Sequence, residues 1–184
     1  MLRFRHLLSI AVLAVILTLG YLVSLQVNGN FHAILPGQAY RSAQPSAQNL
    51  ERWAGQAGIR SVINLRGAHQ GTPWYDAEIA ASQKLGIAHF DFGMSAGRRL
   101  SDEDAETLIA LLRDAPKPVL IHCKSGADRT GLAAALYLAQ LGKGEGLAEA
   151  QISIRYGHIS IPHTNAWPMN ESWEAMEGRF GYES

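Results

Sequence analysis

The stretch from Pro118 to Leu141 constrains the fold most, because it joins two apolar segments through a polar, glycine-containing loop. Residues 118–121 are apolar and include two β-branched side chains, which predicts a buried strand. Residues 130–141 are rich in Ala and Leu without proline, which predicts a buried helix. The loop from His122 to Gly131 therefore connects a strand end to a helix N-terminus. Amides and the positive end of the helix dipole converge there, which predicts an anion-binding site.

This loop contains the only cysteine of the chain, Cys123, and Arg129 follows it after five intervening residues. A thiol near a helix N-terminus and a guanidinium is stabilised as the thiolate. The planar fork of arginine suits two oxygens of a phosphate dianion. A thiolate beneath a bound phosphate is equipped for in-line phosphoryl transfer to sulfur. The hydroxyl of Thr130 is a candidate to hydrogen-bond the thiolate and make it a better leaving group in the second step.

The pattern His-Cys-x5-Arg-Thr-Gly resembles the signature of the cysteine-dependent protein tyrosine phosphatase superfamily. The small size is similar to its dual-specificity branch, including atypical bacterial, plant and fungal members. The segments Tyr40–Pro45 and Val62–Arg66 resemble those atypical members as well, so that the similarity covers roughly residues 33 to 157. It implies a phosphatase that hydrolyses phosphate monoesters through a phosphocysteine intermediate, without a cofactor. The predicted phosphate-binding residues are Lys124, Ser125, Gly126, Ala127, Asp128, Arg129 and Thr130.

The general acid that protonates the leaving oxygen has two main candidates, Asp91 and Asp128. Asp91 stands near the end of a predicted strand, about where dual-specificity enzymes carry their acid loop. Asp128 lies inside the phosphate loop, and this segment resembles myotubularin-type phosphatases, in which an in-loop aspartate is thought to be the acid. Like-charge repulsion from a bound dianion would help Asp128 to keep its proton. The alternative is that Asp128 pairs with a basic group and shapes the loop; Asp102 and Asp104 suit a helix N-terminus better.

Three basic residues near the expected site bear on the class of substrate, but they do not decide it. Lys124 either faces the pocket mouth, which would suit polyanionic substrates, or is a solvated loop residue. Arg41 and Arg66 stand at predicted strand ends, where each either lines the pocket or acts as an ion-pair partner or loop anchor. The resemblance favours a phosphorylated protein, with phosphotyrosine or dual specificity, as substrate; an inositol phosphate or phosphoinositide is the alternative. The histidine before the nucleophile is expected to be structural.

The first thirty residues differ in composition from the rest. Arg3 and Arg5 precede nineteen uncharged residues, 7–25, which are long enough to cross a hydrocarbon core of about 30 Å. The run exceeds a usual signal-peptide core and lacks a good cleavage site, so we favour an uncleaved signal anchor over residues 1–30, with cleavage as the alternative. The arginines should stay cytoplasmic, which places the domain 31–184 outside, in the periplasm of a Gram-negative bacterium.

Charge and cysteine content exclude several classes of function. The 16 basic and 16 acidic residues cancel, so nothing indicates a nucleic-acid partner. One cysteine excludes an intramolecular disulfide and a thiolate-rich metal site. His158 and His163 are five residues apart in a predicted loop, and we expect no metal site. A rhodanese-type sulfur transferase and a non-catalytic, membrane-tethered phospho-binding module are the rival functions.

Alternating strands and helices predict an α/β domain with a central, mostly parallel sheet and helices on both faces. The cysteine loop then lies at the carboxyl end of a strand, where such sheets bind ligands. Strands are expected over residues 31–35, 38–41, 59–65, 87–92 and 118–121. Helices are expected over residues 47–57, 73–85, 102–113, 130–141 and 146–156, and a C-terminal piece around residues 171–179 completes the chain.

Overall fold

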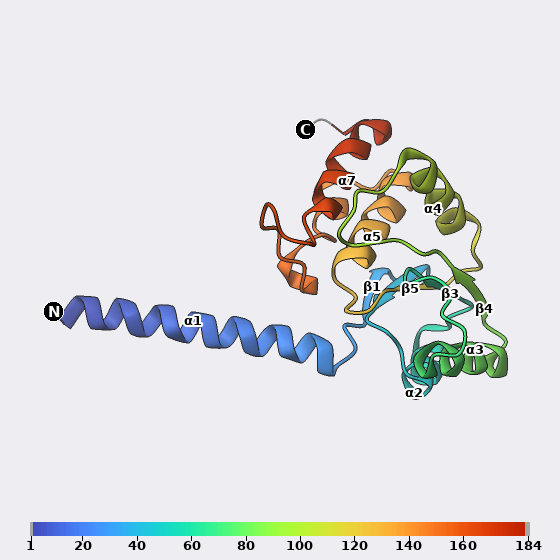
Figure 1. Cartoon of the computed structure of the whole chain (residues 1–184), viewed down its shortest axis with the longest axis horizontal. Coiled ribbons are helices and arrows are strands. Elements are labelled where there is room, and N and C mark those ends of the chain that lie inside the picture. The colour runs from blue at the N-terminus through green and yellow to red at the C-terminus, as the bar shows by residue number, and fades with distance from the viewer. Residues whose placement is uncertain (1, 183–184) are drawn as a thin grey trace.

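The computed structural model describes residues 2–182, with a five-stranded sheet at the centre of the domain (Figure 1). The strands are β1 (His32–Leu35), β2 (Ala39–Ser42), β3 (Ser61–Asn64), β4 (Ala88–Asp91) and β5 (Val119–His122). The helices are α1 (Leu2–Val27), α2 (Ala47–Ala57), α3 (Pro73–Leu85), α4 (Asp102–Asp114), α5 (Asp128–Gln140), α6 (Glu145–Glu149) and α7 (Pro168–Glu177), with short 3₁₀ turns η1 (Ile154–Tyr156) and η2 (Gly178–Phe180).

The order of the strands brings the functional loops together at one edge of the sheet. The order is β1-β2-β5-β3-β4, and only β1 runs antiparallel to its neighbour. Ser42, His122, Asn64 and Asp91 end the four parallel strands side by side, since the register pairs each with the next. The loops that follow these strands therefore meet at the carboxyl edge of the sheet. This arrangement confirms the expected α/β fold with a mostly parallel sheet.

Helices cover both faces of the sheet, as the sequence predicted. The apolar side chains of β5 alternate between the two layers: Leu120 packs with Leu50 and Trp53 of α2, whereas Val119 and Ile121 pack with α4, α5 and α7. Figure 1 shows α2 and α3 on one side of the sheet and α4, α5 and α7 on the other. Because α5 is buried along nearly its whole length, the helix that follows the cysteine loop is a fixed part of the core.

Local capping signals set the bounds of several helices. The side chain of Ser46 accepts a hydrogen bond from the Asn49 amide at the start of α2, and Gly58 ends that helix with φ of 66°. Ser101 accepts in the same way from the Asp104 amide at the start of α4. These helices begin and end within one residue of the predicted positions.

The prediction of a continuous helix over residues 146–156 was wrong, because the chain leaves the helical path between α6 and η1. The backbone carbonyl of Gln151 accepts a hydrogen bond from Arg41 at 2.8 Å, so it is committed to a tertiary contact. Gly131 of α5 also lies against this carbonyl, where a Cβ atom would come within 2.9 Å. The C-terminal piece expected around residues 171–179 is helix α7, which runs from Pro168 to Glu177 and is followed by η2.

The N-terminal helix α1 extends away from the domain and contacts it near its C-terminal end (Figure 1). Residues Ser9–Val27 have a mean hydropathy of 2.3 and are only 6% buried. A helix of this length and composition fits a membrane anchor or a signal sequence equally well.

Candidate active site

The cysteine loop lies between β5 and α5, at the edge where the parallel strands end. Cys123 is the first residue after β5 and is buried, whereas Arg129 stands in the first turn of α5 and is partly exposed. The hydroxyl of Thr130 is buried and has no hydrogen-bond partner among the described residues. The cysteine and the arginine thus occupy the two ends of one loop, at the N-terminus of a buried helix.

The four consecutive carbonyl oxygens of residues 124–127 are all held from outside the loop. The carbonyl of residue 124 accepts from the backbone amide of Gln44 (3.2 Å), and that of residue 125 from Asn30 Nδ2 (3.0 Å) and Gln26 Nε2 (3.3 Å). The carbonyls of residues 126 and 127 accept from Arg41 Nη2 (2.9 and 3.3 Å). In a trans peptide the carbonyl and the following N–H point in opposite directions. Outward carbonyls therefore turn the amides of residues 125–128 toward the inside of the loop. Within residues 2–182, the amides of Ser125, Gly126 and Asp128 meet no protein acceptor, so they are available to an anion.

Arg41 lies behind the loop and not in the pocket. Its side chain is fully buried, and it donates to the carbonyls of Gly126 and Ala127 as well as to Gln151. Its guanidinium also covers the ring of Tyr156, with Cζ 3.8 Å from the ring centroid. Burial lowers the pKa of Arg41 to about 10, so the residue remains a cation at neutral pH. Of the two roles considered from the sequence, the structure shows the loop anchor.

Gly126 allows the loop to pack directly against the end of β2. Its φ is 72°, and a Cβ atom there would come within 2.6 Å of the Ala43 nitrogen and the Ser42 carbonyl carbon. The segment Tyr40–Pro45, which carried part of the sequence resemblance, therefore forms the support of the cysteine loop.

The catalytic arginine of the sequence prediction is held by the two neighbouring loops. Arg129 Nη1 donates to the carbonyl of Leu65 at 3.3 Å, after β3, and to that of Met94 at 3.2 Å, after β4. Both acceptors are neutral backbone oxygens and both are bonded by Nη1, so the guanidinium has further N–H donors for an anion. The loops after β3, β4 and β5 thus converge on one cation.

Arg66 borders the same site. Its guanidinium lies over Trp74, with Cζ 3.5 Å from the ring centroid, and Nη1 donates to Gln44 Oε1 at 2.8 Å. Burial and then the positive charge of Arg129 lower the pKa of Arg66, while Glu78 and Cys123 oppose this. Arg66 is therefore close enough to interact electrostatically with Cys123 and Arg129, at the two ends of the cysteine loop.

Further basic side chains surround this edge of the sheet. Lys124 is exposed. Arg98 and Arg99, on the loop after β4, line a polar hollow of about 210 Å³ together with Met94 and Asp104. Basic residues therefore stand on the loops after β3, β4 and β5, although the chain as a whole is neutral.

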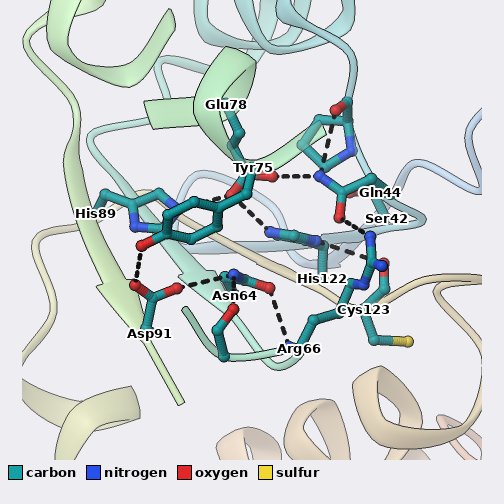
Figure 2. Close-up of polar contacts among 12 residues, drawn as sticks. Ser42, Gln44, Asn64, Arg66, Tyr75, Glu78, His89, Asp91, His122 and Cys123 are labelled. Carbon is teal, nitrogen blue, oxygen red and sulfur yellow. Dashed lines mark hydrogen bonds and ion pairs between the residues drawn. The ribbon is translucent and has the colours of Figure 1, made fainter. Parts of the chain in front are cut away.

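A buried carboxylate beneath the loop was missed by the sequence analysis (Figure 2). Glu78 of α3 accepts hydrogen bonds on Oε1 from His122 Nε2 at 3.0 Å and from His89 Nε2 at 2.7 Å, and on Oε2 from Gln44. Burial by itself would raise the pKa of Glu78, but the hydrogen bonds from His122 and His89 outweigh it and lower the pKa to about 2. The available signal was a carboxylate on the inner face of a predicted helix, one turn from Tyr75.

Asp91 lies at the end of β4 with both carboxylate oxygens occupied. Oδ1 accepts from Asn64 Nδ2 at 2.8 Å, and Oδ2 accepts from the Tyr75 hydroxyl at 2.5 Å. The hydrogen bond to Asp91, and then burial, raise the pKa of Tyr75 to about 12. Figure 2 shows the Asp91 carboxylate directed toward Asn64 and Tyr75, with Asn64 between it and Cys123.

Asp128 is the first residue of α5, and it is paired. Its Oδ1 lies 2.8 Å from Nδ1 of the buried His158, whose Nε2 lies 2.8 Å from Asn170 Oδ1. The Asn170 amide nitrogen in turn donates to the Ser160 hydroxyl at 3.1 Å. His158 is thus held between a carboxylate and an amide, one on each of its ring nitrogens. The structure thus brings together Asp128 and a histidine that the sequence had left without a role.

The lesser aspartates have other partners. Asp102 forms an ion pair with Arg179 at 2.8 Å, and Asp104 accepts from the Ser101 hydroxyl at 2.8 Å. Over the part of the chain that the structure describes, no three His, Cys, Asp or Glu side chains gather in the way that would hold a metal ion.

Comparisons with known proteins agree with this geometry. Residues 30–164 match a family model described as DSP-PTPase phosphatase fused to NAD+ kinase. Over 87 residues the chain is 34% identical to a beta-lactamase hydrolase-like protein of Xylella fastidiosa, which is 46% of this chain and 20% of that protein. The chain thus spans about a fifth of the length of the curated relatives it matches.

Solved structures share the fold at low sequence identity. TpbA of P. aeruginosa is 19% identical with a TM-score of 0.59, covering 84% of this chain and 92% of that one. The core catalytic domain of the PP-IP phosphatase SIW14 from S. cerevisiae is 20% identical with a TM-score of 0.61, covering 83% and 90%. PTPMT1 in complex with PI(5)P is 20% identical with a TM-score of 0.59, covering 81% and 97%.

Proposed function

The chain belongs to the family of DSP-PTPase phosphatase domains, and from this premise we propose that it hydrolyses phosphate monoesters through a phosphocysteine intermediate on Cys123. The membership confirms the family resemblance drawn from the loop His122–Gly131. The observation that carries the proposal is the loop whose carbonyls are all held from outside, so that its amides face the space above a buried cysteine. Such a loop binds a tetrahedral dianion and places its phosphorus over the sulfur.

In the first step the Cys123 thiolate attacks phosphorus opposite the ester oxygen. The S–P bond forms as the P–O bond breaks, and the leaving oxygen takes a proton from an acid. The loop amides and the guanidinium of Arg129 stabilise the charge on the three equatorial oxygens. The thiolate is therefore consumed, and the alcohol or phenol leaves neutral.

In the second step a water attacks the phosphocysteine, and the group that gave up its proton accepts one from that water. The S–P bond breaks, which releases inorganic phosphate and restores the thiolate. The proton balance closes over the two steps, because the same carboxylate donates and then accepts. The buried hydroxyl of Thr130, free of other hydrogen bonds within the described chain, is a donor that can stabilise the returning sulfur anion.

We assign the acid to Asp128 in this mechanism. Asp128 lies at the end of the phosphate loop, and its Oδ1 is 2.8 Å from Nδ1 of His158, an imidazole that can exchange a proton with it. Asp91 is the alternative, but both its oxygens accept hydrogen bonds from Tyr75 and Asn64, and its carboxylate is directed toward these two side chains (Figure 2).

Two substrate classes fit the site. Phosphotyrosine or dual-specificity protein substrates are the first candidate, and TpbA, which has the same fold, has been solved in complex with pTyr. Basic residues on the loops after β3, β4 and β5, namely Lys124, Arg66, Arg98 and Arg99, support the second, an inositol phosphate or phosphoinositide, because several cations at one edge of the sheet suit a polyanion. SIW14 and PTPMT1 share the fold and are described with inositol-based ligands or substrates.

We further propose that residues 1–30 anchor the protein in a membrane and that the domain over 31–184 lies outside the cytoplasm. The uncharged, exposed helix Ser9–Val27 supports the anchor, and the arginines that precede it in the sequence support the orientation. A non-catalytic, phospho-binding module tethered in the same way is the remaining alternative.

The test is turnover of p-nitrophenyl phosphate by the full chain in detergent. We expect a burst of p-nitrophenol followed by steady turnover, and we expect Cys123→Ser to lose both. Ser153→Ala, outside the loop, is the control and should retain activity. Full turnover by Cys123→Ser would refute the phosphocysteine mechanism, whereas tight binding of phosphate esters without any burst in the wild type would favour the non-catalytic module. Phosphotyrosine peptides and inositol polyphosphates, compared by kcat/KM, separate the two substrate classes.

A further inference from the structure

Exposed apolar side chains gather on residues 154–161, hereafter segment 154–161. The described residues outside α1 include five large apolar side chains that are strongly exposed, and three of them, Ile154, Ile159 and Ile161, lie within these eight positions at 51%, 44% and 54% exposure. Single exposed apolar residues need no explanation, but a group of them marks a contact surface.

The segment lies along the last turns of α1. The Tyr21 hydroxyl donates to the Arg155 carbonyl at 2.6 Å, and Leu17 and Tyr21 line one hollow together with Ile154. Further along, a Cβ atom at Gly157 would lie 3.6 Å from Leu25 Cδ1, and Leu25 is buried. Figure 1 shows this part of the chain, coloured orange, on the side of the domain from which α1 extends.

The part of α1 that contacts segment 154–161 shows how deep in a bilayer the segment would lie if α1 crosses it. Residues 17 to 25 of a helix cover about 12 Å of its axis, whereas the apolar span Ser9–Val27 covers roughly 28 Å. A bilayer has a hydrocarbon core of about 30 Å, so nearly the whole span is needed to cross it. The part of α1 beside segment 154–161 therefore belongs to the half of the span nearest the domain. Lipid that surrounds residues 17–25 of α1 would therefore also contact segment 154–161.

We propose that segment 154–161 inserts into the membrane interface beside α1, with the lipid bilayer as its partner. This inference rests on the membrane anchor of the proposed function. Ile154, Ile159 and Ile161 would contact the acyl chains, and the exposed side chain of Arg155 would reach the phosphate groups of the headgroups. The surface that the bilayer covers is continuous with the exposed apolar face of α1.

This contact reaches the phosphate loop by two routes. His158, inside the segment, holds Asp128, and the two flanking residues Gly157 and Ile159 line a mostly apolar hollow of about 390 Å³ with that carboxylate. On the α1 side, Gln26 donates to the carbonyl of Ser125. The bilayer therefore fixes the two elements that support the phosphate loop, which then lies directly above the membrane surface.

The test uses the full chain in a Cys123→Ser background, which removes the single native thiol. One cysteine is introduced at a time, as Ile159→Cys, Ile161→Cys or, as an independent site, Ile154→Cys, and labelled with an environment-sensitive fluorophore. Val15→Cys reports on α1, and Glu103→Cys on the exposed start of α4 is the matched surface control. The proteins are placed in bilayers of phosphatidylethanolamine and phosphatidylglycerol, with or without lipids that carry a quenching spin label near the headgroup or deep in the acyl chain.

We expect headgroup-proximal spin labels to quench the probes at 159 and 161 several-fold more than the probe at 103. Because Ile154 lies beside Leu17 and Tyr21, we expect deep labels to quench the probe at 154 as well as the probe at 15. Quenching at the three isoleucine sites that equals the control, together with strong quenching at 15, would refute insertion of the segment while leaving the anchor intact. An unquenched probe at 15 would refute the anchor itself, and the insertion with it.

Discussion

Replacing Glu78 by glutamine tests whether the buried carboxylate stabilises the cysteine loop. In the folded protein the pKa of Glu78 is lowered from the ordinary value of 4.5 to about 2, because hydrogen bonds from His122 and His89 outweigh the effect of burial. This difference corresponds to roughly 3 kcal/mol in favour of the ionised, folded state at neutral pH. Glu78→Gln keeps the shape but removes the charge, and its amide group would face the amide of Gln44 that now donates to Oε2. We therefore expect the free energy of unfolding at pH 7 to fall by about 3 kcal/mol.

The stabilisation that Glu78 provides is expected to decrease as the pH falls. Because the folded pKa of Glu78 lies below the unfolded one, its contribution is complete above pH 4.5 and is lost as the pH falls toward 2. The wild type should lose this stability on acidification, and Glu78→Gln should not, so the difference between them shrinks as the pH falls. Urea unfolding of the full chain in detergent, followed by tryptophan fluorescence between pH 7 and pH 3, measures this difference.

A matched control is available on the neighbouring helix α2. Glu51 is exposed and lies 3.6 Å from Lys84, so Glu51→Gln should change the free energy of unfolding by less than about 0.5 kcal/mol at any pH. If Glu78→Gln behaved like Glu51→Gln, or if its cost were the same at every pH, the argument that Glu78 is held ionised beneath the loop would be wrong.

Three further predictions concern the loop. Asp128→Asn should slow hydrolysis of alkyl phosphates far more than that of p-nitrophenyl phosphate, whose leaving group needs no proton; a selective loss in Asp91→Asn instead would move the acid to Asp91. Arg41→Lys should weaken binding of inorganic phosphate, measured by calorimetry, because a single ammonium cannot bond both Gly126 and Ala127 carbonyls while also holding Gln151. Gly126→Ala should lower both stability and turnover, since its Cβ would come within 2.6 Å of backbone atoms; unchanged thermal unfolding would contradict this.

Features encoded by neighbouring residues were predictable from the sequence. Ser46 and Gly58 bound α2 as expected, because capping depends on a few adjacent residues. The loop from Cys123 to Arg129 was equally predictable, since one short segment supplies the strand end, the nucleophile and the helix start. The alternation of elements predicted the mostly parallel sheet, but not the order of its strands.

Features that depend on distant residues were not predictable. His158 is 30 positions from Asp128, and Glu78 is 44 from His122, so no local pattern joins either pair. The break between α6 and η1 has the same origin, because Arg41 bonds Gln151 across 110 positions of sequence. In each case the contact that decides the structure lies between elements that only the finished fold brings together.

The sequence composition placed the boundary between the apolar segment and the domain at residues 30 and 31. Long-range hydrogen bonds to the phosphate loop cross this boundary. Asn30 is buried, and its amide donates to the carbonyls of Ser125 and Tyr156 at 3.0 and 2.9 Å. Gln26, still within α1, donates to the same Ser125 carbonyl. A chain that began at residue 31 would lack both side-chain donors, and the phosphate loop would be free to turn this carbonyl inward, where it would repel a bound anion. The end of the apolar helix and the phosphate loop are therefore parts of one structural unit, although composition separates them.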